Sequence, residues 1–294
     1  MQLGLVGLGR MGFNMRERLR AAGHDVVGYD RNQDVSDVAS IAEMVEKLNA
    51  PRIVWIMVPH GEPTKQTVRE LAGLLSAGDL VIEGGNSKYT DDQENAALLA
   101  ENGIKYVDVG VSGGVWGAKN GYGLMAGGDA EDVERAMPIF DALRPEGPRE
   151  EGFVHAGPVG AGHYAKMIHN GIEYGLMQAY AEGLAVLHRR DDLVADPAQV
   201  ARIWCDGSVI RSWLLELSAD ALEADPGLSA IAPYVADSGE GRWTVAEALE
   251  LDVPAPVITQ AMIARLRSRD AEGFGDRVVA ALRDAFGGHG TRPG

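Results

Sequence analysis

The feature that most constrains the fold is a glycine-rich turn near the N-terminus. Residues 2–7 form an apolar run typical of a β-strand, residues 13–22 continue as a helix, and a second strand is expected over 25–30. A lone GxGxxG pattern is weak evidence. Here it follows a strand, opens a helix and precedes a strand that ends in Asp30, so it indicates a dinucleotide-binding βαβ unit. The turn consists of Gly7, Leu8, Gly9, Arg10, Met11 and Gly12.

Each glycine of this turn has a physical role in such a unit. Gly7 permits the tight turn, Gly9 lets the backbone approach a pyrophosphate, and Gly12 allows close packing of the helix on the strand. The N-terminus of the helix then offers free N–H groups and a positive dipole end to the phosphates.

The residues around the second and third expected strands bear on which cofactor binds. A carboxylate at Asp30 accepts hydrogen bonds from the adenosine ribose hydroxyls and repels a 2′-phosphate, which favours NAD. Arg31 could offset that repulsion, so NADP stays open. Val58, at the end of the third strand, and Asn86, after the fourth, complete the expected cofactor contacts.

The alternation of strands and helices continues up to Pro158 and then stops. Strands are expected over 52–58, 79–83, 105–111, 124–126 and 153–155, and helices over 64–75, 90–102 and 130–143. Helices alone are expected afterwards, up to about residue 188 and over 197–224 (with an interruption near residue 207), 244–251, 256–268 and 275–286. This order predicts an α/β Rossmann-type doubly wound sheet over 1–158, followed by an all-α domain over 159–294.

Two loops are rich in glycine and small polar residues, residues 84–87 and residues 112–114. Both follow expected strands. Ligands of parallel sheets bind beyond the carboxyl ends of the strands, so the loops are expected to line a site, although either could be an ordinary turn.

The long helix that opens the second half carries a polar stripe. Lys166 and Glu173 differ by about 20° in azimuth and stand roughly 10 Å apart along the axis. His169 and Asn170 lie within about 60° of Lys166 on either side. A solvated face is one interpretation. The other side of the helix favours burial in a core, with the stripe lining a cavity, because it carries Ile168, Ile172, Gly175, Ala179 and Val186.

The composition excludes several classes of protein. A net charge of −16 argues against a nucleic-acid partner, and it requires a local cluster of cations for any anionic substrate. The single cysteine, Cys205, excludes an intrachain disulfide, and no Cys/His spacing resembles a zinc site. No apolar run approaches the length of a membrane span, and the first strand leaves no room for a signal peptide. We therefore expect a cytoplasmic protein without a metal.

The chain resembles the 6-phosphogluconate dehydrogenases of the β-hydroxyacid dehydrogenase superfamily, in their short bacterial form that often uses NAD. The segment Lys-x-x-His-Asn-x-x-Glu-Tyr is the most specific part, because other members of the superfamily differ there. The matching segments are Gly7-Leu-Gly-Arg-Met-Gly12, Glu83-Gly-Gly-Asn-Ser87, Gly110-Val-Ser-Gly-Gly114, Gly160-Ala-Gly-His163, His169-Asn-Gly-Ile-Glu-Tyr174, Gly241-Arg-Trp-Thr244, Ala264-Arg265 and Arg283-Asp-Ala-Phe-Gly-Gly-His289.

The resemblance implies roles for these residues in the oxidative decarboxylation of 6-phospho-D-gluconate, a reaction of the pentose phosphate pathway. Lys166 maps to the general base and Glu173 to the general acid. A lysine acts as a base only where burial or nearby positive charge lowers its pKa. Asn86, Ser112, Gly113, Gly114, His169 and Asn170 map to positions that orient the substrate, and Tyr174, Arg265, Arg283 and His289 map to the surroundings of its phosphate. In the family the last two come from a partner subunit, which implies a homodimer or homotetramer in which the helical domain serves substrate binding and dimerisation.

At two expected substrate contacts the sequence departs from the longer members of the family. Ser238 stands where those members have a phosphate-binding lysine, and Val115 where they have an acidic substrate contact. A 3-hydroxyisobutyrate-type dehydrogenase is an alternative, because Lys166 and Asn170 also satisfy its Lys-x-x-x-Asn spacing. A non-catalytic NAD(H)-sensing protein is a third, but it would be expected to lose the polar stripe.

Overall fold

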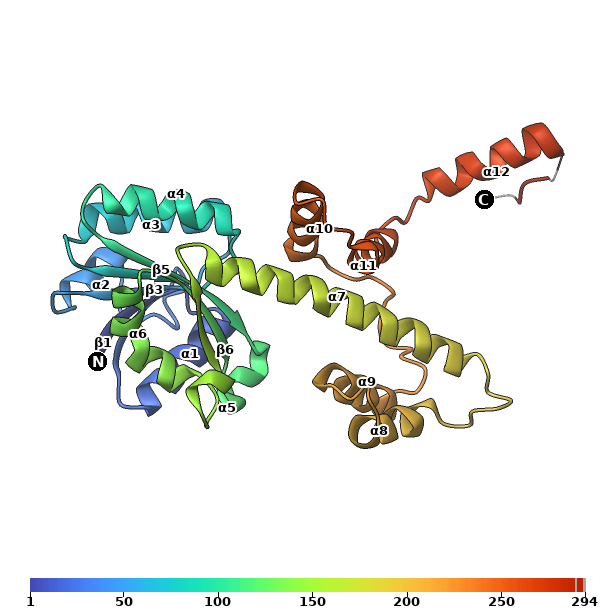
Figure 1. The fold of residues 1–294 in the computed structure, drawn as a ribbon, viewed down its shortest axis with the longest axis horizontal. Helices are drawn as coiled ribbons and strands as arrows, with labels where there is room; N and C mark the ends of the chain where they lie inside the picture. Colours follow the sequence, from blue (N-terminus) through green and yellow to red (C-terminus); the bar gives the residue numbers. More distant parts are fainter. Residues whose placement is uncertain (289, 293–294) are drawn as a thin grey trace. The chain divides into compact units, whose positions relative to one another are not determined.

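A seven-stranded sheet organises the first half of the chain. In the computed structural model, which describes residues 1–288 and 290–292, the strand order is β2-β1-β3-β4-β5-β6-β7 (Figure 1). All neighbouring strands are parallel except β5 and β6, which are antiparallel. The strands are β1 (Gln2–Val6), β2 (Asp25–Tyr29), β3 (Ile53–Ile56), β4 (Leu80–Glu83), β5 (Lys105–Ser112), β6 (Gly123–Gly128) and β7 (Phe153–Gly157).

Helices cover both faces of this sheet, because alternate residues of the central strands point to opposite sides. Trp55 joins a core with α1 and α6, whereas Ile56 joins a second core with α2, α3 and α4. The helices are α1 (Arg10–Ala21), α2 (Ile41–Glu46), α3 (Glu62–Leu74), α4 (Tyr89–Ala100), α5 (Gly117–Asn120) and α6 (Ala130–Leu143), with short 3-10 turns at Gly114–Trp116 and Arg149–Glu151. The predicted doubly wound α/β class is confirmed.

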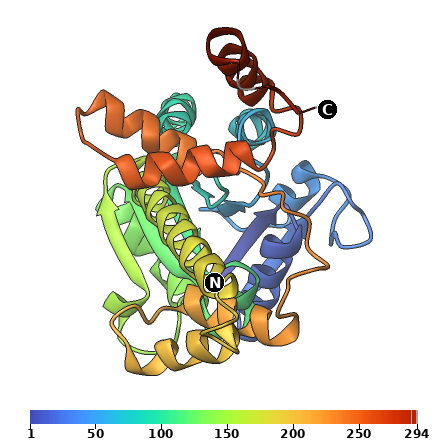
Figure 2. The ribbon, with the colours of Figure 1, turned by 90° about the vertical axis from the view of Figure 1, so that its right-hand side faces the viewer.

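The second half is helical, as predicted. Its helices are α7 (Ala161–His188), α8 (Pro197–Gly207), α9 (Trp213–Ala224), α10 (Glu240–Glu250), α11 (Pro256–Arg267) and α12 (Phe274–Gly287). The pair α8 and α9 and the pair α10 and α11 are each packed together (Figure 2). The chain divides into two compact units, residues 1–169 and 170–294, with the division inside α7. The domain boundary expected at residue 158 stays a prediction.

One expectation about α7 was wrong. Ile172 is 52% exposed and Val186 is 66% exposed, so the apolar side of the helix is not buried in a core of the described chain. The first two turns pack tightly, and Gly162, His163 and Met167 are buried there. Farther along the apolar side, Gly175 is buried against Val257 of α11, whereas Ala179 is exposed. The described residues therefore cover the apolar side only in part.

Within the described part of the chain, no helix combines the length and the apolar character needed to cross a lipid bilayer.

Candidate functional site

The glycine turn after β1 has the shape that a dinucleotide requires. Gly7 has a φ of +95°, and a Cβ there would lie 2.5 Å from the carbonyl oxygen of Met57. A Cβ on Gly12 would lie 1.9 Å from the Gly7 oxygen, so α1 begins in direct contact with the turn. A Cβ on Gly9 would meet no atom within 4 Å. The backbone at Gly9 therefore faces open space in which phosphates fit beside the N-terminus of α1.

Asp30 is held beside this turn by backbone donors. Its Oδ2 accepts a hydrogen bond of 2.7 Å from the Leu8 N–H, and its Oδ1 accepts one of 2.8 Å from the Asn32 N–H. Each carboxylate oxygen keeps a second lone pair, so the group can still accept ribose hydroxyls. Arg31 is exposed, and Val58 lies against Gly7. The residues present fit an NAD-type cofactor.

Lys166 is buried against the sheet, and its ammonium is directed to the loop after β4. Its Nζ donates a 2.7 Å hydrogen bond to Oδ1 of Asn86. The close approach of α7 to β5 and β6 depends on glycine. A Cβ on Gly110 of β5 would lie 2.5 Å from the Cβ of Lys166, and one on Gly162 of α7 would lie 2.3 Å from the oxygen of Met125 in β6. Glycine on both elements thus brings the lysine to the strand ends.

The loop after β5 lies at the end of the same strand that supports Lys166. Ser112 is the last residue of β5, and Gly113 and Gly114, which follow it in the loop, have φ values of +124° and +52°. These positive φ values favour glycine, so the loop bends sharply with little side-chain bulk. Such a loop can bring backbone N–H groups close to a ligand.

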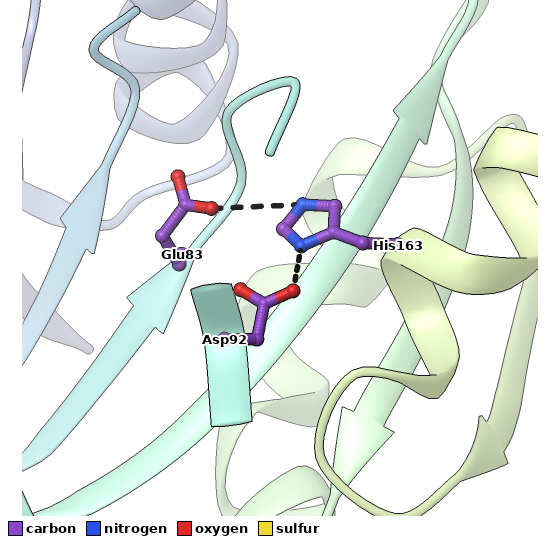
Figure 3. Close-up of side chains that lie close together, drawn as sticks. All are labelled: Glu83, Asp92 and His163. Atoms are coloured by element: carbon purple, nitrogen blue, oxygen red, sulfur yellow. Dashed lines mark hydrogen bonds and ion pairs between the residues drawn. The ribbon is translucent and has the colours of Figure 1, made fainter. Parts of the chain in front are cut away.

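Beneath the loop of residues 84–87 lies a buried cluster of ionisable groups that the sequence did not reveal (Figure 3). His163, in the first turn of α7, contacts Oδ2 of Asp92 through Nδ1 at 2.8 Å and the Gly85 carbonyl oxygen through Nε2 at 3.1 Å. Oε2 of Glu83 lies 3.7 Å from the same Nε2. Asp108 accepts hydrogen bonds from the N–H groups of Gly160 and His163 at 2.6 and 2.8 Å.

Burial and mutual charge shift the pKa values of this cluster. Burial raises the pKa of Glu83 to about 7, against the opposing charge of His163, and raises that of Asp108 to about 6. Burial also opposes the charge on His163, but the charge and hydrogen bond of Asp92 outweigh it, and the pKa rises to about 10. The imidazole is therefore a cation around neutral pH. The sequence did carry a signal for this cluster, since Glu83 ends an otherwise apolar strand and Asp108 lies between valines inside another.

The same three side chains, Glu83, Asp92 and His163, form the group among the described residues whose ligand atoms lie close enough for a metal ion. Both imidazole nitrogens already face hydrogen-bond acceptors, however, and an imidazole coordinates a metal through a nitrogen lone pair. The geometry is that of a hydrogen-bonded ion cluster.

In the second unit, the side chains of three residues meet. The guanidinium of Arg265 lies 3.4 Å from the ring centroid of Tyr174, and its Nη1 donates a 3.0 Å hydrogen bond to the Ala236 carbonyl oxygen. The Tyr174 hydroxyl lies 3.2 Å from Oγ of Ser238. Two hydroxyls and a cation are thus assembled where an anionic group could bind.

The other residues predicted to belong to the site do not take part in the contacts described above. His169 is exposed, Asn170 and Glu173 are half-buried on α7, and Arg283 is exposed on α12. His289 lies outside the described residues. The roles assigned to all these residues stay predictions.

Comparison with known proteins connects both units to the same enzymes. A family model described as the NAD binding domain of 6-phosphogluconate dehydrogenase matches residues 2–145, and one described as the C-terminal domain of 6-phosphogluconate dehydrogenase matches residues 162–280. The NAD(+)-dependent, decarboxylating 6-phosphogluconate dehydrogenase of Haloferax volcanii is 41% identical over 98% of this chain and 98% of its own length. YqeC of Bacillus subtilis, which bears a provisional 6-phosphogluconate dehydrogenase name, is 43% identical over 99% of each chain.

A solved structure shows the same similarity. A Plasmodium falciparum 6-phosphogluconate dehydrogenase superposes with a TM-score of 0.83 and 26% identity. The match covers 98% of this chain but 65% of that longer protein.

Proposed function

Because the chain belongs to the 6-phosphogluconate dehydrogenase family, we propose that it catalyses the oxidative decarboxylation of 6-phospho-D-gluconate to D-ribulose 5-phosphate and carbon dioxide, with reduction of NAD. The observation that carries the proposal is the buried Lys166, hydrogen-bonded to Asn86 at the strand ends. A buried amine at the carboxyl end of a sheet that carries a dinucleotide-binding turn is a candidate general base for a dehydrogenase.

The cofactor is NAD in this proposal. Gly7, Gly9 and Gly12 would hold its diphosphate and Asp30 its adenosine ribose, and bound NAD supplies the acceptor for a hydride from C3 of the substrate. The NAD-dependent name of the Haloferax volcanii relative supports this choice. The exposed Arg31 is the one feature beside Asp30 that favours NADP.

Lys166 accepts the proton of the substrate 3-hydroxyl as C3 is oxidised. Asn86 orients the amine. Its side-chain oxygen accepts one N–H of Nζ, and this hydrogen bond fixes the directions in which Nζ presents its lone pair or its other protons to the substrate. The resulting 3-keto acid loses its carboxylate as carbon dioxide. The bonding electrons of the broken C–C bond move toward the C3 carbonyl, and the Lys166 ammonium returns its proton to the C3 oxygen, so that an enediol forms.

Glu173 lies seven residues after Lys166 on α7 and is half-buried. In the proposal its carboxylic acid donates a proton to the carbon of the enediol that becomes C1 of the product. Ser112, Gly113, Gly114, His169 and Asn170 would orient the sugar chain through hydroxyl contacts.

The phosphate would bind at Tyr174, Ser238 and Arg265. Arg265 provides a fixed guanidinium, and phosphate favours such a planar donor. Ser238 replaces the lysine of longer family members, so this chain would bind the phosphate with hydroxyls and arginines rather than with an ammonium.

We further propose that the chain works as a homo-oligomer in which α12 packs on a neighbouring subunit. No described residue of α12 is buried, and its apolar positions, Phe274, Val278, Leu282 and Phe286, recur every four residues. A groove of about 300 Å³ between α7 and α11 offers an apolar surface near Gly175 and Val257. Association through α12 would carry Arg283 to the partner, as the family resemblance implies.

The oligomer is tested by light scattering on the wild-type protein and on Leu282→Glu, with Leu249→Glu on α10 as a control at a similarly exposed leucine. A dimer or larger assembly that dissociates only in the Leu282 variant supports the proposal. A wild-type monomer would contradict it.

The reaction is tested by following NADH or NADPH formation with 6-phosphogluconate and, separately, with 3-hydroxyisobutyrate. Turnover with the phosphorylated sugar acid and NAD is expected. A preference for 3-hydroxyisobutyrate would show that the protein is a 3-hydroxyisobutyrate-type dehydrogenase. Binding of the cofactor without turnover of either substrate would favour a non-catalytic NAD(H)-sensing protein.

A further inference from the structure

The loop of residues 84–87 is held by two side chains from the start of α7. His163 contacts the carbonyl oxygen of Gly85, and Lys166 donates to the side chain of the next residue, Asn86. The two side chains are three positions apart on a helix, so they lie on the same side of it. The position of Asn86 relative to the amine therefore depends on where His163 holds the loop.

The contacts of His163 require both of its nitrogens to donate. Nε2 faces the Gly85 carbonyl, which can only accept, and Nδ1 faces the Asp92 carboxylate. Asp92 already accepts a 2.8 Å hydrogen bond from the hydroxyl of Tyr106 through its other oxygen. An imidazole satisfies two acceptors only when it is doubly protonated. Figure 3 shows the ring between Asp92 and Glu83.

The other two carboxyl groups of the cluster, Glu83 and Asp108, hold the loop of residues 84–87 and the start of α7. Oε1 of Glu83 accepts a 2.8 Å hydrogen bond from the Gly85 N–H, on the loop side. Asp108 accepts the N–H groups of Gly160 and His163, on the helix side. A buried polar network of this kind holds its members tightly as long as every partner is present.

We propose that His163 is a positioning residue of the active site: anchored by Asp92, its imidazolium holds the Gly85 carbonyl so that Asn86 meets the amine of Lys166. The inference rests on the proposed function for the role of Lys166. It extends that function, because His163, Asp92 and Glu83 touch neither substrate nor cofactor in it.

The proposal predicts what loss of the anchor does. In Asp92→Asn the imidazole loses its nearest anion, and only Glu83 and Asp108, at 3.7 and 3.9 Å, remain to stabilise its charge. The pKa of His163 should therefore fall, which favours a ring in which one nitrogen presents a lone pair rather than a proton. If that nitrogen faces the Gly85 oxygen, two acceptors oppose each other and the loop moves away. A displacement of about 1 Å in the partner of a catalytic base costs about 100-fold in turnover.

The kinetic test compares Asp92→Asn, Asn86→Ala and the double variant. Asp92→Asn is expected to lose kcat with little change in KM. The kcat of the double variant is expected to fall within about twofold of that of Asn86→Ala, because both changes disrupt one arrangement. Losses that multiply would show that Asp92 acts independently of Asn86 and would overturn the proposal.

A matched control separates positioning from stability. Asp79 is another carboxylate beside β4, but it lies at the opposite end of that strand, where it accepts from the N–H groups of Arg52 and Ser76. Asp79→Asn should lower the melting temperature and leave kcat unchanged. If Asp92→Asn does not fold, Tyr106→Phe removes a single hydrogen bond to Asp92 and is expected to lower kcat in the same direction by a smaller factor, about threefold to tenfold.

An NMR experiment without substrate distinguishes failure of this proposal from failure of the proposed reaction. In protein with 15N-labelled histidine and asparagine side chains, the His163 signals, assigned by their loss in His163→Gln, are expected to report a doubly protonated ring at pH 7.5. The side-chain amide signal of Asn86, assigned by its loss in Asn86→Ala, should shift in Asp92→Asn but not in Asp79→Asn. A neutral ring, or an unmoved Asn86 signal, would overturn the proposal even if the wild-type enzyme turns over 6-phosphogluconate. If both signals behave as expected but the protein does not turn over 6-phosphogluconate, the positioning role of His163 stands and the proposed reaction is rejected.

Discussion

The ammonium of Lys166 and the side-chain oxygen of Asn86 are 2.7 Å apart, although the residues are separated by 80 positions in the chain. This contact joins the start of α7 to the loop after β4. It places the candidate base at the carboxyl ends of the strands, where parallel sheets bind their ligands.

The first prediction concerns the base itself. Lys166→Met keeps an unbranched side chain as far as Cε and removes the amine, so kcat with 6-phosphogluconate should fall by about 100- to 10,000-fold. NADH binding, measured by fluorescence, should stay intact because the glycine turn is unchanged. A variant that kept most of its turnover would show that another group removes the proton.

The second prediction concerns the phosphate. Arg265→Ala removes the guanidinium beside Tyr174, and loss of one charge-assisted contact should raise KM for 6-phosphogluconate by about 10- to 100-fold. The KM for NAD should not change. Arg202→Ala is the control, because that guanidinium pairs with Asp220 and Glu223 on the surface. Equal effects of the two substitutions would exclude Arg265 from the phosphate site.

The third prediction concerns the choice of cofactor. Asp30→Ala removes the carboxylate that disfavours a 2′-phosphate, so the ratio of kcat/KM for NAD to that for NADP should fall. Steady-state kinetics with both cofactors measures this ratio. A wild-type protein that already preferred NADP would show that Arg31 outweighs Asp30.

The fourth prediction concerns stability as a function of pH. The folded-state pKa of Glu83 is raised to about 7 and that of Asp108 to about 6, chiefly by burial. A carboxyl whose pKa is raised on folding contributes stability that is fully present below its unfolded pKa and is lost as the pH rises through the folded value. The free energy of unfolding should therefore fall between about pH 4 and pH 8, by an amount on the order of 1 to 3 kcal/mol.

Glu83→Gln tests the source of that fall. A glutamine cannot ionise, so the variant should lose less stability than the wild type between pH 5 and pH 8 in urea unfolding monitored by circular dichroism. Parallel pH profiles for the two proteins would assign the change to other groups.

The sequence predicted the parts of the fold that local patterns specify. The spaced glycines of the first turn and the period of α7 are local, and both elements are present. The short helix α2 was missed, although Ser40 and Glu43 form a capping pair in which the Ser40 hydroxyl accepts from the Glu43 N–H at 3.1 Å. Six helical residues are too few for periodicity to show.

What the sequence could not predict depends on contacts between residues that are far apart in the chain. His163 and Asp92 are 71 positions apart, and their pairing follows from the packing of α4, β5 and α7. The antiparallel direction of β6 also has no pattern of its own in so short a strand. The exposure of Ile172 shows that a periodic apolar side of a helix does not have to be buried within the described residues.

The most direct test of the central claim is the stoichiometry of the wild-type reaction with 6-phosphogluconate labelled at C1. The account predicts one labelled carbon dioxide released for each NADH formed, with ribulose 5-phosphate as the remaining product. NADH formed without labelled carbon dioxide, or no NADH at all, would contradict it.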